Sequence, residues 1–231
     1  MTSPEIVPNT TLQLAALTAL YTLYEETSTT FSVACAKGCA TCCSINVTIT
    51  TLEAAHLVSH PLFQDAQIKQ SISNISDQPH FIPAVTINRL AQACLHEHEM
   101  PEETGTHAPG TCPFLDQHHQ CRVYANRPFA CRAMSSTERC QEDGAAEMPP
   151  FLYTLNLAVC QLLEHLDRNG GTGNMVDVLA GRTERIIANT SLPGFPVPPE
   201  DQHRLALFLK KLHNCPVADQ TLADFFPEKY I

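Results

Sequence analysis

The residues of this chain that could do chemistry are its cysteines. Eleven are present, and four of them fall within the nine residues CAKGCATCC at positions 35–43. A second group spans positions 112–131, about 70 residues further along the chain. Reduced thiols bind zinc or iron–sulfur clusters, and they also form disulfides or redox switches. The candidate metal ligands are Cys35, Cys39, Cys42, Cys43, Cys112, Cys121 and Cys131.

The apolar stretch at 12–24 bears on the compartment, which decides whether thiols stay reduced. The first basic residue is Lys37, whereas a secretory signal needs basic residues ahead of its apolar core. The stretch is also too short to cross a bilayer, which takes about 20 apolar residues. We therefore expect a cytoplasmic protein with no membrane partner. In that compartment a dense cysteine pattern indicates metal or redox chemistry rather than disulfides.

Charge narrows the range of partners. The chain has 14 basic and 24 acidic residues, a formal net charge of −10. Nucleic-acid binding depends on clustered Lys and Arg side chains at the phosphates, so we expect no nucleic-acid partner. The expected partner is a metal ion or cluster. Whether the C-terminal helices also meet a protein partner stays open.

Helical periodicity dominates the rest of the sequence. INVTIT at 45–50 alternates like a short strand, and Thr50 precedes Glu53 at the spacing of a helix capping box. We predict a mainly α fold with one helical domain over 1–231, a cysteine-cluster region at 35–132 and a C-terminal helical part at 150–231. The predicted helices cover residues 10–27, 52–59, 84–99, 149–168, 175–188 and 201–213.

The cysteine-rich region is predicted to be a small irregular insert that contains a hairpin. CPFL at 112–115 and CRVY at 121–124 can pair across a polar turn at 116–120, and Cys131 follows ten residues later. Zinc and iron–sulfur sites commonly join loops in this way. We therefore expect the two cysteine groups to form one split chelating site.

The geometry of the first cysteine run is open at this stage. If it were helical, Cys35, Cys39 and one of the next two cysteines would share a face. Gly38 is equally compatible with a loop. Adjacent Cys42 and Cys43 point in different directions in either geometry, so the sequence does not decide which of them is a ligand.

The remaining cysteines are predicted to be structural. Cys94 and Cys160 lie in apolar helical stretches, where a cysteine acts as a small buried hydrophobe, and Cys215 is similar. Cys140 fits either a structural or a binding role.

The histidines and glycines add little at this stage. His118 and His119 lie in the predicted hairpin turn, where one could complete a mixed site. His96 and His98 are two residues apart and should diverge on a helix, because two ligands on one helical face need a spacing of four. The glycine-rich stretch at 170–173 is expected to be a helix stop and linker.

The two cysteine segments resemble the YkgJ-type cysteine-cluster family, a family of zinc- or iron-chelating domains. The resemblance implies chelation by the seven candidate cysteines and does not supply a reaction. Flagellin lysine methylases are similar in the cysteine motif, so an enzymatic function remains one of the hypotheses. The matching residues are Cys35, Cys39, Cys42 and Cys43, then Cys112, Pro113, Phe114 and Leu115, then Cys121, Val123, Tyr124, Arg127, Pro128, Cys131 and Arg132.

The number of candidate thiol ligands bears on which metal the protein binds. A structural zinc site takes four ligands, whereas a [4Fe–4S] cluster takes three or four thiolates and can leave others beside it. Spare thiols and neighbouring arginines, namely Arg122, Arg127, Arg132 and Arg139, favour an iron–sulfur cluster over zinc.

A radical S-adenosylmethionine enzyme is disfavoured. Cys35, Cys39 and Cys42 have the spacing of that cluster loop, but no alternating strand and helix series surrounds them. Three hypotheses remain. The first is a metal- or cluster-binding protein, the second is an S-adenosylmethionine-dependent protein lysine methylase, and the third is a metal-free thiol redox switch.

Overall fold

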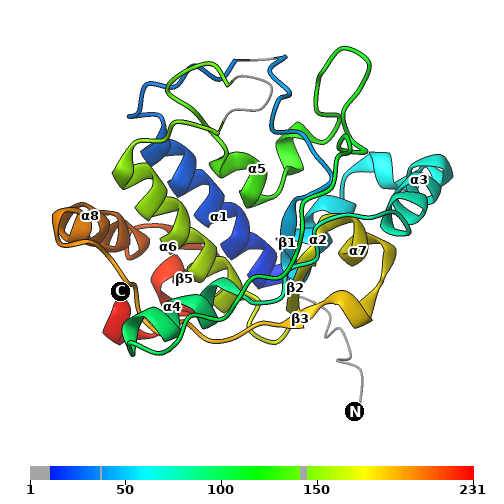
Figure 1. The fold of residues 1–231 in the computed structure, drawn as a ribbon. Helices are drawn as coiled ribbons and strands as arrows, with labels where there is room; N and C mark the ends of the chain where they lie inside the picture. Colours follow the sequence, from blue (N-terminus) through cyan, green and yellow to red (C-terminus); the bar gives the residue numbers. More distant parts are fainter. Residues whose placement is uncertain (1–10, 37, 141–144) are drawn as a thin grey trace.

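The computed structural model describes residues 11–36, 38–140 and 145–231, and its fold is mainly α (Figure 1). Two small antiparallel sheets accompany the helices, one ordered β1-β2-β3 and one made of β4 and β5. The α-helices are α1 (Thr11–Ser28), α2 (Thr51–Val58), α3 (Ala66–Ser76), α4 (Ile87–Leu95), α5 (Phe129–Ala133), α6 (Pro150–Leu166), α7 (Met175–Ala180) and α8 (Gln202–Leu212). The strands are β1 (Thr48–Thr50), β2 (Gly171–Asn174), β3 (Ile187–Ala188), β4 (Pro216–Val217) and β5 (Gln220–Thr221). Short 3-10 helices are η1 (Pro61–Gln64), η2 (Tyr124–Asn126), η3 (Thr183–Arg185), η4 (Pro199–Asp201), η5 (Leu222–Phe225) and η6 (Glu228–Tyr230).

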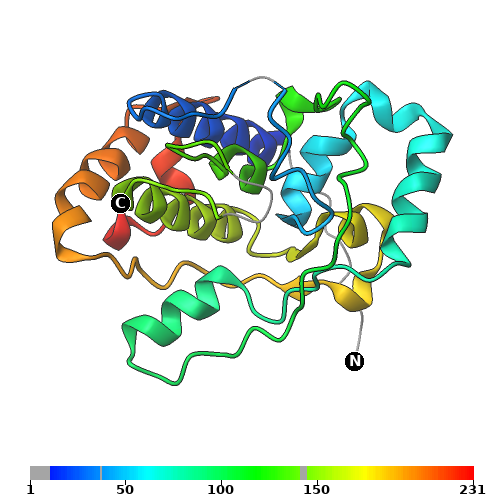
Figure 2. The same cartoon turned by 45° about the horizontal axis from the view of Figure 1, so that its top comes forward.

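The larger of two hydrophobic cores lies between α1, α6, α8 and the C-terminal segment. Helices α1 and α6 run side by side in both views (Figures 1 and 2), and Leu17, Leu20 and Leu155 are fully buried between them. Each buried leucine contributes about 1.5–3 kcal/mol to folding. This core includes Phe129 and so supports α5, which carries Cys131.

The smaller core joins β1, α2, α3 and α7 to the cysteine-rich region. Phe114 and Val123 are 1% exposed and belong to this core, and Cys112 and Cys121 pack partly buried against it. Phe114 also contacts Phe63 of η1, with 5.5 Å between ring centroids. Burial of these two side chains therefore fixes the backbone that carries Cys112 and Cys121.

The start of α2 is stabilised by two buried carboxylates. Thr50 and Glu53 form the predicted capping box, with the backbone N–H of each bonded to the side chain of the other. Asp167, at the end of α6, accepts hydrogen bonds from the Thr51 hydroxyl at 2.6 Å and the Leu52 N–H at 3.0 Å. Burial raises the pKa of Asp167 to about 6.

Glu53 does more than cap its own helix. It is 4% exposed, and its Oε1 accepts the Tyr21 hydroxyl of α1 at 2.8 Å and the Phe129 N–H of α5 at 2.7 Å. The pKa of Tyr21 is raised well above its usual value, first by burial and then by the Glu53 charge, so the phenol stays a donor. One carboxylate thus joins α1, α2 and α5, and α5 carries Cys131.

Three sequence predictions of local structure were wrong. The stretch predicted as a linker at 170–173 contains most of β2, which pairs with β1 and β3 because Gly171 and Gly173 let the neighbouring segments approach closely. The predicted helix 175–188 stops at Ala180, where Gly181 adopts a φ of 74° and ends α7. Helix α4 ends at Leu95, so the sequence HEHE lies outside it.

No helix in the described part of the chain has the length and apolar character needed to cross a membrane.

Replacing Glu53 by Gln should lower the free energy of unfolding by about 2–4 kcal/mol, because an amide NH2 would face N–H donors that now bond to carboxylate oxygens. Urea denaturation of the metal-free protein measures the loss. Glu26→Gln on the exposed face of α1 is the matched control, expected to change stability by about 0.5 kcal/mol or less. Equal stability of the Glu53 variant and the wild type would contradict the role given to this carboxylate.

His165 provides a pH-dependent contribution to stability. Its Nδ1 accepts the Leu192 N–H at 3.0 Å, and burial, with the Arg168 charge second, lowers its pKa to about 4. The neutral ring is therefore favoured in the folded state. This contribution is complete above the unfolded pKa of about 6.5 and is lost as the pH falls towards 4.

Wild-type protein should lose about 3 kcal/mol of stability through His165 between pH 7 and pH 4, and His165→Gln should lack that part of the decline. Denaturation curves at several pH values measure the difference between the two proteins. Asp167 titrates in the same range in both proteins, so its effect cancels in the comparison. His213→Gln, at an exposed position, is the control. Parallel pH profiles for wild type and the His165 variant would refute the prediction.

Candidate metal centre

The first cysteine run is a loop and not a helix. Gly38 has a φ of 88°, a conformation that favours glycine. Two isolated turns are present, in which the Cys39 N–H donates to the Ala36 carbonyl and the Cys43 N–H donates to the Ala40 carbonyl. The helical face considered for Cys35, Cys39 and a later cysteine therefore does not exist. Cys42 and Cys43 follow one another at the end of this loop, where it enters the fold.

The second group starts in a tight hairpin. Leu115 and Cys121 form an antiparallel bridge, and the Arg122 N–H donates to the Phe114 carbonyl at 2.8 Å. Asp116 closes the turn by accepting the N–H groups of His118 and Gln120, and these bonds hold its pKa below the usual range.

Backbone pairing joins the two cysteine segments. Ser44 and Thr111 form an antiparallel bridge, and the Cys112 N–H donates to the Cys43 carbonyl at 3.1 Å. The Ile45 N–H bonds the Gly110 carbonyl at 3.2 Å on the other side of the bridge. Residues nearly 70 positions apart in sequence are thus neighbours in a short ladder.

Cys131 reaches the same place from α5. The first residue of this helix, Phe129, is 1% exposed and packs on Tyr24 with ring centroids 4.7 Å apart. Its N–H is the one bonded to Glu53. The large core and the Glu53 carboxylate together set the position of Cys131.

The thiols of five cysteines act electrostatically on one another. The pKa of Cys131 is raised to about 12 by burial and by the charges of Cys112, Cys121 and Cys42. The pKa of Cys112 is raised to about 11, mainly by burial. These five cysteines, which we call the thiol cluster, are Cys42, Cys43, Cys112, Cys121 and Cys131.

Cys42 differs from the other members of the thiol cluster. The Cys43 thiol donates a hydrogen bond to its sulfur, and this bond is the main reason why its pKa falls to about 6, with Arg127 adding to the effect. The pKa of Cys43 is correspondingly raised, by the same hydrogen bond and by burial. This hydrogen bond therefore favours the thiolate form of Cys42 and the thiol form of Cys43.

The other two predicted ligands are not in the thiol cluster. Cys35 and Cys39 are exposed on the preceding part of the loop. Among the residues that the structure describes, no three His, Cys, Asp or Glu side chains stand in an arrangement that could hold a metal ion. The structure gathers the five sulfurs of the thiol cluster within electrostatic range without forming a complete coordination shell.

Arg127 acts on the thiol cluster, and Arg132 follows Cys131 in α5. The Arg127 guanidinium stacks on the Tyr124 ring at 3.8 Å, and it lowers the pKa values of Cys42 and Cys121. Its Nε is buried and has no hydrogen-bond partner among the described residues. Arg132 lies 4.2 Å over the Tyr21 ring and is fixed by the carbonyls of Arg127 and Ala125 and by Glu25.

The donor set fits a thiophilic metal. Thiolates suit zinc and iron–sulfur clusters, and a bound cation would cancel the repulsion among several thiolates. The buried Arg127 Nε–H has no partner among the described residues, and N–H donors close to the sulfurs tune such centres. The sequence motif pointed to Arg127. Nothing in the sequence predicted that Glu53 also accepts hydrogen bonds from Tyr21 and Phe129.

The other predicted cysteine and histidine roles had mixed outcomes. Cys160 and Cys215 pack partly buried against the large core, as expected for structural residues. Cys94 is exposed, and its predicted burial was wrong because the buried residues of α4 are Asn88, Ala91 and Ala93. His118 and His119 are exposed in the hairpin turn.

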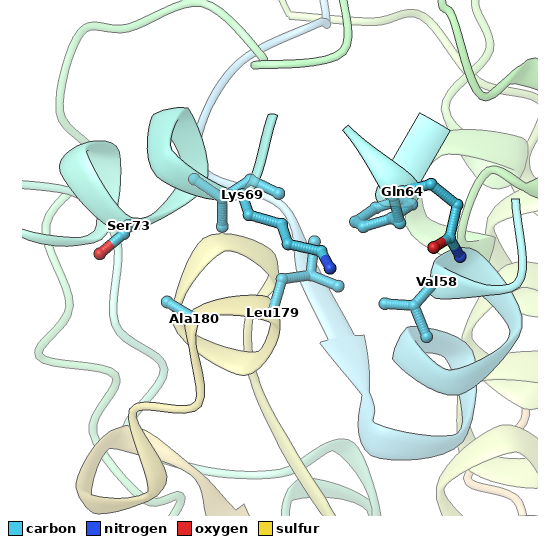
Figure 3. A pocket seen from close by; sticks show the side chains of 8 residues that line it. Val58, Gln64, Lys69, Ser73, Leu179 and Ala180 are labelled. Carbon is cyan, nitrogen blue, oxygen red and sulfur yellow. The ribbon is translucent and has the colours of Figure 1, made fainter. Parts of the chain in front are cut away.

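A cavity of about 470 Å³ lies apart from the thiol cluster, between α2, η1, α3 and α7 (Figure 3). None of the side chains that line it is a cysteine, and its polar groups are Gln64, Lys69 and Ser73. Phe63 lines this cavity and also packs on Phe114 of the hairpin, so the two sites share one aromatic contact.

Comparison with known proteins identifies the cysteine-rich region. Residues 34–150 match the family CxxCxxCC, described as "Putative zinc- or iron-chelating domain". The match includes both cysteine segments and confirms the resemblance seen in the sequence. No curated protein and no solved structure matches the chain. The chain belongs to the CxxCxxCC family of zinc- or iron-chelating domains.

Proposed function

We propose that this protein binds an iron–sulfur cluster through the thiol cluster. The observation that carries the proposal is the backbone pairing that joins Cys43 to Cys112 and places Cys121 across the hairpin from Leu115. The charges of these thiols and of Cys131 in α5 also act on one another. Cys42, Cys112, Cys121 and Cys131 are the proposed ligands. Cys43 serves as the hydrogen-bond donor to the Cys42 sulfur or replaces it as ligand.

The number of thiols supports a cluster over a zinc ion. Five thiols exceed the four ligands of a structural zinc site, and an iron–sulfur cluster tolerates further thiols and N–H donors at its sulfurs. A bound cluster would supply one-electron redox chemistry or a rigid structural crosslink. The residues of this chain would hold it, exclude water on the Phe114 side and place the Arg127 charge beside it.

The remaining residues of the cysteine motif extend this proposal. Cys35 and Cys39 lie on the same loop as Cys42 and are proposed as additional thiols for assembling or exchanging the metal. In our proposal residues 35–132 are the chelating region of a single domain, and residues 150–231 are its helical support. A reducing compartment such as the cytoplasm would keep all seven thiols free.

Elemental analysis and a UV–visible spectrum of protein purified without oxygen test the proposal. Iron and sulfide in equal amounts, with a broad visible absorption band, are expected. Zinc in a colourless sample would contradict the cluster and support a structural zinc site. Protein without either metal, with thiol alkylation that changes on oxidation, would instead support the redox switch.

Cys131→Ser should lower the metal content and the metal affinity on the order of tenfold or more, because it removes a ligand held by the buried Glu53 network. Metal analysis of the purified variant, with a chelator competition series, measures the loss. Cys94→Ser is the matched control, since that thiol is exposed on α4. Full metal content in Cys131→Ser and also in Cys112→Ser would exclude the thiol cluster as the binding site.

Arg127→Gln should weaken metal retention about 10–100-fold, because it removes both the positive charge and the buried Nε–H beside the sulfurs. Arg127→Lys restores the charge without that N–H and should recover only part of the retention. The rate of metal transfer to a chelator gives the readout, and Arg139→Gln, at an exposed position, is the control. Identical rates in wild type and both Arg127 variants would show that the guanidinium does not act on the centre.

A further inference from the structure

His96 and His98 lie beside each other, contrary to the prediction from sequence. Their ring centroids are 5.6 Å apart and their planes are tilted by 34°. The prediction that they diverge assumed that α4 continues through them, but this helix ends at Leu95. The chain turns back immediately after the helix, so the two side chains come from neighbouring parts of one turn.

The conformation of Glu97 produces this turn. Its φ of 53° is left-handed, which is uncommon for a residue other than glycine. The Glu97 N–H donates to the Cys94 carbonyl at 3.4 Å, and the His98 N–H donates to the Ala93 carbonyl at 3.0 Å. This is the Schellman pattern of a helix end, where glycine usually occupies the left-handed position. A strained backbone residue thus stands between two imidazole side chains.

The spacing of the two rings suits a shared metal ion. Zinc–nitrogen bonds of about 2.0–2.1 Å at a tetrahedral angle place two imidazole centroids roughly 5 Å apart. The observed 5.6 Å is wider by about half an ångström, which side-chain rotation can close. Both residues are exposed, and neither ring makes a hydrogen bond or ion pair with the rest of the described chain. Their nitrogen atoms are available as ligands.

The charge around the pair favours a cation. The stretch HEHEMPEE at 96–103 carries four glutamates and no basic residue. Figures 1 and 2 place α4 at the lower edge of the molecule, whereas α5 and the loop after α1 lie above it. Helix α4, which the histidine pair follows, thus lies in a different part of the molecule from α5, which carries Cys131.

We propose that His96 and His98 form a second, exposed binding site for a divalent transition-metal ion. The two imidazoles occupy two coordination positions. Water or a ligand from another molecule fills the others, because the described residues place no third donor with them. Such an open site binds zinc or nickel more weakly than a closed thiolate centre and exchanges the ion faster. The site does not depend on the occupant of the thiol cluster.

Titration with Ni²⁺ tests the site in the full chain as purified, with its cysteine centre occupied. Isothermal titration calorimetry should show one class of Ni²⁺ sites in wild type that is lost, or weakened at least about tenfold, in the double variant His96→Ala/His98→Ala. The double variant His118→Ala/His119→Ala alters another exposed histidine pair and should keep the site. Unchanged binding in the His96/His98 variant would overturn the proposal.

A second pair of variants tests the turn itself. Glu97→Gly and Glu97→Val both remove the charge, but only glycine adopts the left-handed conformation without strain. Ni²⁺ should bind the glycine variant roughly fivefold or more tightly than the valine variant. Equal affinity of the two variants would overturn the role of the turn in bringing the imidazoles together.

Discussion

The fold around the cysteines depends on the need to satisfy one buried carboxylate. Glu53 is almost completely removed from water, and an ionised carboxylate in that position is tolerated only when donors surround it. Its donors come from Tyr21, Thr50 and Phe129, which belong to three separate segments. Because Phe129 begins α5, satisfying the carboxylate also places Cys131 above the large core.

The second constraint is the burial of the hairpin. Phe114 and Val123 have their side chains in the smaller core, so the backbone next to each is fixed, and that backbone carries Cys112 and Cys121. The ladder between Cys43 and Cys112 then ties the end of the first loop to the hairpin. Rigid parts of the fold thus hold Cys43, Cys112, Cys121 and Cys131 partly buried, whereas Cys35, Cys39 and Cys42 on the loop are exposed. This division is consistent with a centre that is held firmly on one side and loaded from the other.

The two proposed metal sites differ in chemistry as well as in position. The thiol cluster offers soft sulfur donors beside the Arg127 guanidinium, which suits an anionic metal–thiolate centre. The histidine pair offers neutral nitrogen donors among glutamates at the surface, which suits a hydrated divalent ion. A chain with both kinds of site could hold one metal for structure or electron transfer and exchange another with its surroundings.

The sequence by itself determined the features that depend on neighbouring residues. The Thr50–Glu53 capping box, the helices α1, α6 and α8 and the family motif follow from short-range spacing, because helix caps and apolar periodicity act within a few residues. Helix α3 was not predicted from the sequence. The tertiary structure decided which thiols meet, the strand at Gly171–Asn174, the exposure of Cys94 and the pairing of His96 with His98. These features depend on contacts between distant segments or on where a helix stops, and the energies that set them come from burial and long-range hydrogen bonds that no local pattern records.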